Sequence, residues 1–254
     1  MPGQIRCITE GLIARVEIAH PGKLNAMSRA MWRELRAIFE RLQGDSIVRC
    51  VVVQGEQGAF CAGGDISEYP GFRFHEAQLA DFHENEVWGA LRAMLDCDVP
   101  VVAAIEGACM GAGMEIASCC DIRIAGESAK FGAPIAKLGF PMAPREAMLV
   151  GHAAGAVTAR EMLLEAAVLD AGEMKARGFL NRVVPDDAVN LQAQAAASKI
   201  AALSPQAARL NKQALRALAP VIGAMDVAGA YRYADSSQHR EGIGAFLEKR
   251  RPKF

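Results

Sequence analysis

The sequence lacks the common signatures of phosphate, dinucleotide, zinc-protease and serine-hydrolase sites. It contains no GxxxxGK[ST] loop, no GxGxxG turn after a strand, no GxSxG elbow and no HExxH helix. The pairs His75–Glu76 and His83–Glu84 do not have the spacing of a zinc helix. We therefore expect these pairs on a solvated face and expect no metal site.

The chain also lacks a charge surplus and a long hydrophobic run. Its 254 residues carry 28 basic and 29 acidic side chains, a formal net charge of −1. Nucleic-acid binding needs a basic surplus or patch, so we expect no nucleic-acid partner. No apolar run approaches the roughly 20 residues that span a bilayer, and the N-terminus does not have the pattern of a signal peptide. These absences predict a soluble, cytoplasmic protein with no membrane partner.

The sequence has no CxxC pair, and its 7 cysteines are an odd number. Neither a zinc knuckle nor a dithiol motif is therefore indicated. Most of the cysteines lie inside apolar runs, which is typical of small buried side chains in a reducing compartment. With 52% hydrophobic residues, the chain has ample material for one large domain, or a core with a small appendage.

Hydrophobic patterning predicts an α/β core followed by a helical C-terminal third. Strands are expected at residues 4–9, 12–19, 48–53, 101–105 and 121–125. Between them, helices are expected at residues 28–42, 87–95 and 114–119, with a polar segment from Ser67 to Glu86. Beyond residue 141, helices are expected at residues 158–165, 188–203, 205–218 and 223–233, and one ending near Lys249.

Two strand-to-turn junctions rich in small residues could carry chemistry, namely Ala59–Ile66 and Ile105–Glu115. Small residues let the backbone approach a ligand and expose its N–H groups. Two such groups from separate turns would form an oxyanion hole, and the Glu115 carboxylate could lie beside it. Tight connections and a glutamate that complements a helix dipole explain the same residues without any function.

Together the two turns resemble the signature of the crotonase family, also called the enoyl-CoA hydratase/isomerase superfamily. Phe60–Ile66 is similar to the family turn F-[SC]-A-G-x-D-[IL]. Gly107–Glu115 with Cys120 and Asp121 is similar to G-x-x-x-G-G-G-x-E-L…C-D. Further similar stretches follow the family's order at residues 20–27, 131–134, 138–140 and 245–254. The resemblance therefore extends over nearly the whole chain.

The resemblance implies an α/β fold, a crotonase-like spiral of ββα units with a helical C-terminal oligomerisation region. We place the spiral core, with its acyl-CoA site, at residues 1–195 and the helical trimerisation region at residues 196–254. The family also implies an acyl-CoA substrate, no separate cofactor, and a homotrimer or a hexamer made of two trimers.

By the same resemblance, the backbone N–H groups of Ala62 and Ala112 hold the thioester oxygen and Glu115 is the acid/base. Loss of one such donor typically costs about 10²–10³ in rate. The resemblance places the adenine of CoA near Lys23 and Leu24, and Lys249 of a neighbouring subunit near its phosphates. The implied substrate-binding residues are Lys23, Leu24, Ala62, Gly63, Gly64, Asp65, Ile66, Gly111, Pro134, Ile135, Phe246 and Lys249.

Two departures from the family pattern bear on the reaction. Ile135 stands where hydratases have a second glutamate, and Ala143 stands where some isomerase-type members have an aspartate. An isoleucine cannot carry a proton, so two-glutamate hydration lacks its second carboxylate at this position. We expect Ile135 to make the pocket drier and thereby raise the pKa of Glu115.

Three interpretations follow, and we favour the first. The chain is a hydratase/isomerase-type enzyme with Glu115 as its one acid/base, with or without a substitute for the second glutamate. Alternatively it catalyses another reaction of the family, such as thioester hydrolysis or decarboxylation, or it binds acyl-CoA without turnover. The candidate substitutes are Tyr69, His75, Glu76, His83, Glu84 and Arg145.

Overall fold

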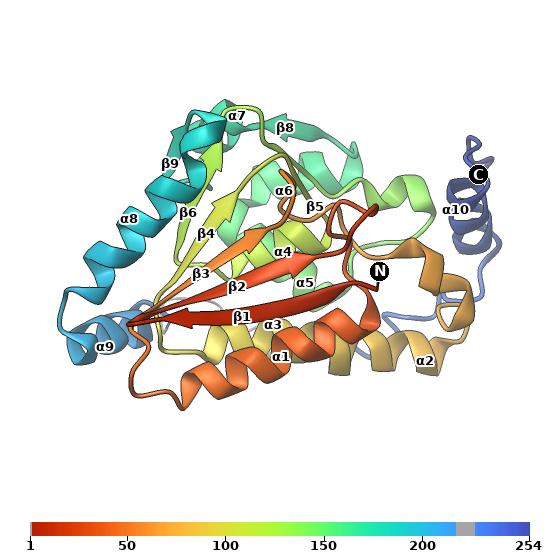
Figure 1. The fold of residues 1–254 in the computed structure, drawn as a ribbon. Helices are drawn as coiled ribbons and strands as arrows, with labels where there is room; N and C mark the ends of the chain where they lie inside the picture. The colour runs from red at the N-terminus through yellow and green to blue at the C-terminus, as the bar shows by residue number, and fades with distance from the viewer. Residues whose placement is uncertain (1, 217–226) are drawn as a thin grey trace.

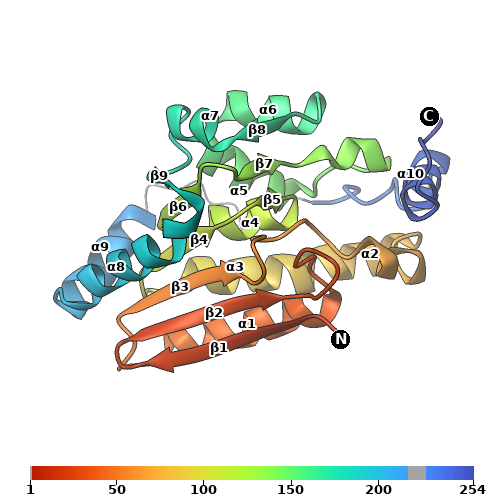
Figure 2. The ribbon, with the colours of Figure 1, turned by 45° about the horizontal axis from the view of Figure 1, so that its top comes forward.

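A six-stranded sheet forms the centre of the molecule (Figure 1). In the computed structural model, which describes residues 2–216 and 227–254, its strands lie side by side in the order β1 (Gln4–Glu10), β2 (Ile13–Ala19), β3 (Cys50–Gly55), β4 (Val101–Ile105), β6 (Ile122–Gly126) and β9 (Arg182–Val184). The β1 strand is antiparallel to β2, and every other neighbouring pair is parallel. A smaller sheet of β5 (Ala108–Met110), β7 (Lys130–Gly132) and β8 (Val168–Asp170) lies beside it (Figure 2).

Helices connect and cover these strands, as crossover connections between parallel strands require. The longer ones are α1 (Arg29–Gln43), α3 (Trp88–Asp96), α5 (Pro144–Ala154), α6 (Ala156–Leu164), α8 (Val189–Ala201), α9 (Pro205–Arg216) and α10 (Ser237–Leu247). The shorter ones are η1 (Ile66–Gly71), α2 (Glu76–Asp81), the π-helical η2 (Phe82–Val87), α4 (Ala112–Ser118), η3 (Pro134–Leu138), α7 (Ala171–Ala176) and η4 (Asp186–Ala188).

Both faces of the large sheet are buried, because alternate residues of β3 point to opposite sides. Val51 and Val53 belong to the main core with α1 and α3, whereas Cys50 and Val52 pack with the inner face of α8. Figure 1 shows the same layers, with α1 and α3 below the sheet and α8 on its other side. The short apolar run that predicted β3 is therefore a strand covered on both faces.

The α1 helix shows how the sequence builds one of these layers. The Ser28 side chain caps the first turn by accepting a hydrogen bond from the amide of Met31, and the helix ends at Gly44. The predicted stripe of Met31, Leu35, Ile38 and Leu42 is buried. Burying each of these side chains contributes about 1.5–3 kcal/mol relative to exposure.

Most predicted elements are confirmed, and the differences have local causes. The polar segment after the first turn, which was left unassigned from the sequence, folds into η1, α2 and η2. A further helix, α5, begins at Pro144, where none was predicted. The helix predicted over residues 223–233 is wrong where the structure describes it, because residues 228–235 form turns and Gly229 has a left-handed φ of 72°. Residues 217–226 lie outside the described residues, and they include the end of the helix predicted over residues 205–218.

The last helix, α10, packs closely on η1 and η3 of its own chain. A Cβ atom on Gly242 would lie 2.1 Å from the carbonyl carbon of Leu138, so only a glycine fits there. Figures 1 and 2 show α10 at one end of the molecule, next to the C-terminus. The expected division after residue 195 falls within α8, which covers the large sheet.

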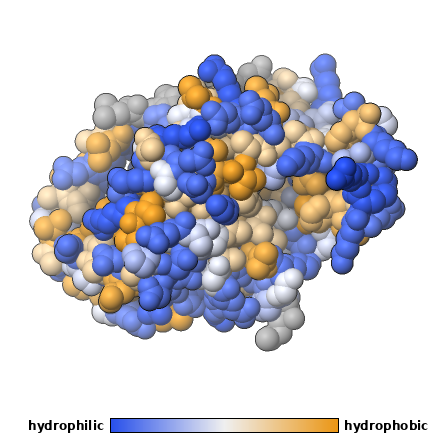
Figure 3. Space-filling view, turned by 90° about the horizontal axis from the view of Figure 1, so that it is seen from above, coloured by the Kyte–Doolittle hydropathy of each residue, from blue (hydrophilic) through white to orange (hydrophobic). Residues whose placement is uncertain are grey.

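The surface carries apolar side chains as well as charged ones. Figure 3 shows patches of them between hydrophilic residues on one face. Within the described ranges, no helix is long and apolar enough to cross a membrane. The cysteines are free thiols, and all but the partly buried Cys7 are buried, in agreement with the prediction of small core side chains.

Gly113 allows α4 to approach the chain at Cys61. A Cβ atom at Gly113 would lie 2.5 Å from the carbonyl oxygen of Cys61, so a side chain would push α4 away from this strand end. We predict that Gly113→Ala lowers the free energy of unfolding by about 1–3 kcal/mol, measured by urea denaturation.

The matched control is Gly44→Ala at the end of α1. There φ is −82° and the nearest atom to an added Cβ is 3.7 Å away, so alanine fits. This variant is expected to stay within about 0.5 kcal/mol of the parent. Equal unfolding midpoints for the two variants would contradict the close contact at Cys61.

Candidate active site

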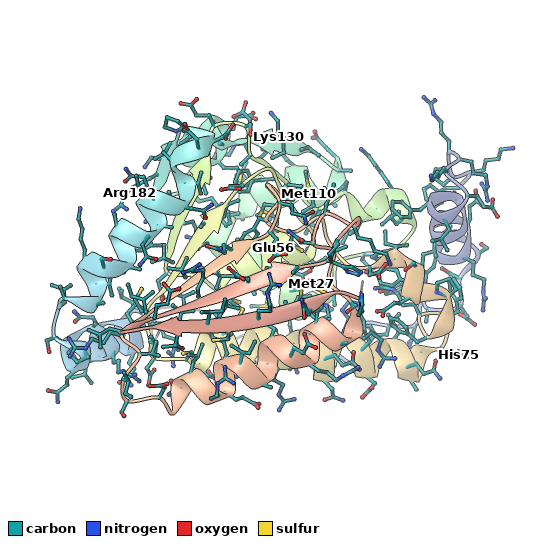
Figure 4. The ribbon with its side chains drawn as sticks, viewed as in Figure 1. Met27, Glu56, His75, Met110, Lys130 and Arg182 are labelled. Atoms are coloured by element: carbon teal, nitrogen blue, oxygen red, sulfur yellow. The ribbon has the colours of Figure 1, made fainter. Side chains whose placement is uncertain are left out.

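Backbone hydrogen bonds join the two glycine-rich turns side by side. The amides of Phe60 and Cys61 donate to the carbonyls of Glu106 and Ala108, with N···O distances of 2.7 and 2.8 Å. The amide of Met110 donates in turn to the carbonyl of Cys61 at 2.9 Å. Met110 accordingly lies near the middle of the molecule in Figure 4. The two turns therefore form one continuous backbone surface at the candidate site.

Glu115 follows the second turn, in the first turn of α4. Gly111 precedes the helix with a φ of 48°, a conformation that favours glycine. The Glu115 side chain is partly buried, and burial raises its pKa well above the usual range. The charge of Glu146 raises this pKa further, and the charge of Arg73 lowers it. The direction is the one expected from a dry pocket, and Ile135 does pack against the apolar core.

The two backbone donors implied by the resemblance differ in their hydrogen bonding. Ala112 is the first residue of α4, where an N–H group has no partner within the helix. The N–H of Ala62 donates to the carbonyl of Leu24, with an N···O distance of 3.0 Å. A thioester oxygen bound at Ala62 would have to take the place of the Leu24 carbonyl.

The loop that carries Leu24 is held in an unusual conformation. Leu24 and Asn25 have φ values of 46° and 61°, which non-glycine residues rarely adopt. The buried Asn25 side chain fixes the loop. Its Nδ2 donates to the carbonyls of Glu56 and Ala59 at 2.7 Å each, and its Oδ1 accepts the amide of His20 at 3.0 Å. Glu56, labelled in Figure 4, lies at the end of β3.

The structure brings Lys23 and Asp65 together across the mouth of the first turn. Lys23 Nζ lies 2.6 Å from Asp65 Oδ2 and 2.8 Å from Ser67 Oγ. Burial alone would raise the pKa of Asp65, but its hydrogen bonds to Lys23 and Ser67 leave that pKa below the usual value. Lys23 itself is exposed, so its charge is accessible at this rim.

The other residues implied as ligands lie in two places. Pro134 and Ile135 follow β7, whose Gly132 carbonyl accepts the amide of Gly111 at 2.9 Å, so they lie beside the second turn. Phe246 and Lys249 lie at the exposed end of α10 and the residues after it.

A second carboxylate, which the sequence analysis missed, comes from α5. The Glu146 side chain is 1% exposed, and its Oε1 lies 3.1 Å from Nδ1 of His83. Its charge acts on Glu115 from a different element of the fold. One feature of the sequence could have indicated Glu146, because it is an acidic residue in the first turn of an apolar stretch that begins with Pro144. From that stretch, only Arg145 was among the candidates named from the sequence.

His83 lies on η2 and is buried, so the solvated face expected for it is wrong. Short π-helical segments are often found at functional sites. Burial lowers the pKa of His83, although hydrogen bonding to Glu146 opposes this effect. The ring therefore stays neutral near neutral pH, and it stacks on Tyr231 with centroids 5.6 Å apart. A neutral ring that donates from Nδ1 to the Glu146 carboxylate leaves Nε2 as a hydrogen-bond acceptor.

The remaining candidate substitutes divide by position. Glu84 pairs with Arg145 at 3.2 Å in the layer that holds His83. His75 and Glu76 are exposed at the start of α2, and Figure 4 shows His75 at the outer edge of the molecule. We therefore remove His75 and Glu76 from the candidates for the site.

Tyr69, the last of these candidates, packs against the first turn. A Cβ atom on Gly64 would lie 2.1 Å from the Tyr69 hydroxyl. The ring is buried, and burial raises the pKa of its hydroxyl. Tyr69 is therefore a neutral wall of the site. In the part of the chain that the structure describes, no three His, Cys, Asp or Glu side chains are grouped so that they could hold a metal ion.

Comparison with known proteins agrees with this geometry. The family model described as enoyl-CoA hydratase/isomerase matches residues 9–254. A probable enoyl-CoA hydratase of Rhizobium meliloti is 32% identical over 250 residues, covering 97% of this chain and 95% of the relative. A crystal structure of an enoyl-CoA hydratase/carnithine racemase from Magnetospirillum magneticum has a TM-score of 0.82 and 37% identity, covering 98% of this chain and 94% of the other. A structure of methylmalonyl-CoA decarboxylase in complex with 2-nitronate-propionyl-CoA has a TM-score of 0.85 and 26% identity, covering 100% and 99% of the two chains.

The raised pKa of Glu115 has a consequence for stability that does not depend on turnover. A carboxyl whose pKa is raised by folding favours the folded state at low pH and loses this contribution as pH rises through the folded-state pKa. Glutamine at this position does not ionise. We predict that Glu115→Gln raises Tm relative to the parent, and that the gain is larger at about pH 8 than at about pH 5.

Glu40→Gln is the control, because Glu40 is exposed on α1 and pairs with Arg36. Its effect on Tm is expected to be small and nearly the same at both pH values. An equal effect of Glu115→Gln at the two pH values would show that Glu115 titrates like an ordinary surface carboxyl.

Proposed function

The chain belongs to the enoyl-CoA hydratase/isomerase family, and we propose that it transforms an acyl-CoA thioester with Glu115 as the group that moves a proton at the α-carbon. It has the crotonase fold and is a hydratase/isomerase-type enzyme. The observation that carries the proposal is the position of Glu115, partly buried beside two joined turns and with a raised pKa. A carboxyl whose pKa is nearer neutrality is well suited to both take and return a proton.

The two turns supply the complementary electrostatics. Removing an α-proton, or adding water to a conjugated double bond, places negative charge on the thioester oxygen. The N–H of Ala112 supports this proposal because it lies at a helix start, where the helix dipole also favours negative charge. The N–H of Ala62 joins it when the substrate displaces the Leu24 carbonyl. Donors placed before the reaction begins stabilise the developing charge without reorganisation.

We expected Glu115 to be the only acid/base, and Glu146 adds a second one. Burial and the charge of Glu146 raise the pKa of Glu115, which favours the protonated form of Glu115. In hydration, Glu146 accepts a proton from the attacking water as the water oxygen bonds to the β-carbon, and Glu115 delivers a proton to the α-carbon. His83 holds Glu146 in place through the contact at 3.1 Å. The chain thus has a carboxylate for the work that Ile135 cannot do.

We propose that CoA follows the rim from Lys23 and Leu24 to Ile66, with Lys249 of a neighbouring subunit near its phosphates. The same proposal makes residues 196–254 the oligomerisation region of a homotrimer or of a hexamer of two trimers. Large apolar side chains on α9 and α10 support it, because they are exposed in the single chain. They are Leu210 at 55%, Leu215 at 68%, Phe246 at 52% and Leu247 at 42% exposure.

Mass spectrometry of a panel of acyl-CoA thioesters in heavy water tests the reaction. The panel contains 2-enoyl, 3-enoyl, saturated and malonyl-type thioesters. Added water, exchanged α-hydrogen, lost CoA and lost carbon dioxide each give a different mass. We predict added water or exchanged α-hydrogen, and a loss of about 10²–10⁴ in rate for Glu115→Gln.

The Glu40→Gln variant serves again as control and should keep the parental rate. Loss of CoA or of carbon dioxide instead would assign thioester hydrolysis or decarboxylation. Binding of CoA thioesters without any change of mass would show that the chain binds acyl-CoA without turnover.

A further inference from the structure

Arg73 is a buried cation, and two of its three side-chain nitrogen atoms have no hydrogen-bond partner in the part of the chain that the structure describes. It lies between η1 and α2, and the whole residue is 1% exposed. Its Nε and Nη2 have no hydrogen-bond partner among residues 2–216 and 227–254. No described carboxylate lies within ion-pair distance of it. An unpaired donor on a buried charge costs free energy, so the structure is incomplete at this point.

A second arginine shows how the same fold satisfies a guanidinium that has no acidic partner. Arg123 packs on the ring of Phe179 at 4.6 Å, much as Arg73 packs on its own aromatic neighbours. Its Nε donates to the carbonyl of Phe179 at 2.6 Å, and its Nη1 donates to the carbonyl of Cys120 at 2.9 Å. Arg73 has no such carbonyls. Among the described residues, Arg145 and Arg216 also have an unpartnered Nε, but their guanidinium groups form ion pairs with Glu84 and Asp98, which Arg73 does not.

Two aromatic rings, roughly perpendicular to each other, pack against the Arg73 guanidinium. Its central carbon lies 4.3 Å from the centroid of Tyr69 and 4.1 Å from that of Phe140. Such contacts stabilise the cation and fix the plane of the group, but they do not satisfy its N–H groups. Nε and Nη2 lie on the same edge of the guanidinium. The free edge is thus the two-pronged one that binds both oxygens of a carboxylate.

Tyr69 connects Arg73 to the first turn of the site. Tyr69, which covers one side of Arg73, also packs against Gly64 of the first turn. The positive charge of Arg73 lowers the pKa of Glu115, so the two groups share one buried region. The exposed Lys23 at the rim, where we place CoA, is a different positive group.

Tyr233 adds another free polar group to the same region. Its hydroxyl is buried without a close hydrogen-bond partner in the described ranges. Burial raises its pKa, and the neighbouring Arg73 guanidinium opposes this effect, first by its charge and then by a longer polar contact with the hydroxyl. The neighbouring histidines are neutral near neutral pH, since burial lowers the pKa of His83 and lowers that of His239 to about 4. Arg73 is therefore the positive charge against which an anion would bind.

We propose that the acyl group of the substrate ends in a carboxylate that binds Nε and Nη2 of Arg73, with the Tyr233 hydroxyl as a third donor. The substrate is then a short-chain monothioester of a dicarboxylic acid with CoA. This inference rests on the proposed function in one respect, that the thioester lies beside Glu115. It adds a recognition element for the far end of the acyl chain.

Binding of unreactive thioesters tests the inference without requiring turnover. The probes are glutaryl-CoA and its monomethyl ester, which differ only in the terminal charge, and the measurement is isothermal titration calorimetry. We expect the parent to bind glutaryl-CoA at least about tenfold more tightly, because hydrogen bonds to charged groups are the stronger ones. Arg73→Met, which keeps length and apolar packing, should bring the two affinities within about twofold. Arg73→Lys should retain part of the preference.

Arg123→Met is the matched control, since it also removes a buried arginine that is stacked on a ring. It is expected to lower stability and to keep the parental preference for the charged probe. Equal affinity of the parent for the two probes would overturn the inference, as would a preference that survives Arg73→Met. Binding of neither probe would overturn it as well.

Turnover of the matching unsaturated pair, glutaconyl-CoA and its monomethyl ester, separates this inference from the proposed function. If neither is converted while the preference in binding persists, the proposed reaction fails and carboxylate recognition stands. If the neutral ester is converted as fast as the acid, the reaction stands and carboxylate recognition fails.

Discussion

The effect of the buried Glu146 charge on Glu115 is the interaction on which this site depends. The two carboxylates come from different helices, and the charge of Glu146 adds to burial in raising the pKa of Glu115. Water would screen such a pair, but Glu146 is almost completely enclosed. The charge of Glu146 therefore favours a protonated Glu115. A site in that state can accept a proton at one carboxylate and release it at the other.

The surrounding structure keeps these charges at fixed places. The two turns are joined by backbone hydrogen bonds, and Gly113 lets α4 lie close against Cys61. His83 holds Glu146, and Arg73 supplies a positive charge that does not form an ion pair with either carboxylate. On the opposite side, Asn25 holds a strained loop near the first turn. Strain of this kind persists only where the neighbouring structure holds it.

The sequence was sufficient for the parts of the site that are local in the chain. The small-residue turns and Glu115 lie within short stretches, so their pattern predicted both the turn-to-helix geometry and the identity of the family. Glu146 and Arg73 were not predictable in this way, because their roles arise from packing between elements distant in sequence. The segment from Ser67 to Glu86 was left unassigned because its helices are too short to show a clear hydrophobic period. The helix predicted near residue 230 failed because Gly229 adopts a left-handed conformation.

The titration of Glu115 itself is the most direct test of this account. Nuclear magnetic resonance of protein labelled with ¹³C at the glutamate carboxyl carbons can follow it, with the signal assigned by its loss in Glu115→Gln. We expect a pKa for Glu115 well above the reference value of about 4.3, and a lower pKa in Glu146→Gln, where the neighbouring charge is absent. A Glu115 signal that titrates near the reference value, or one that Glu146→Gln leaves unchanged, would contradict the coupling of the two carboxylates.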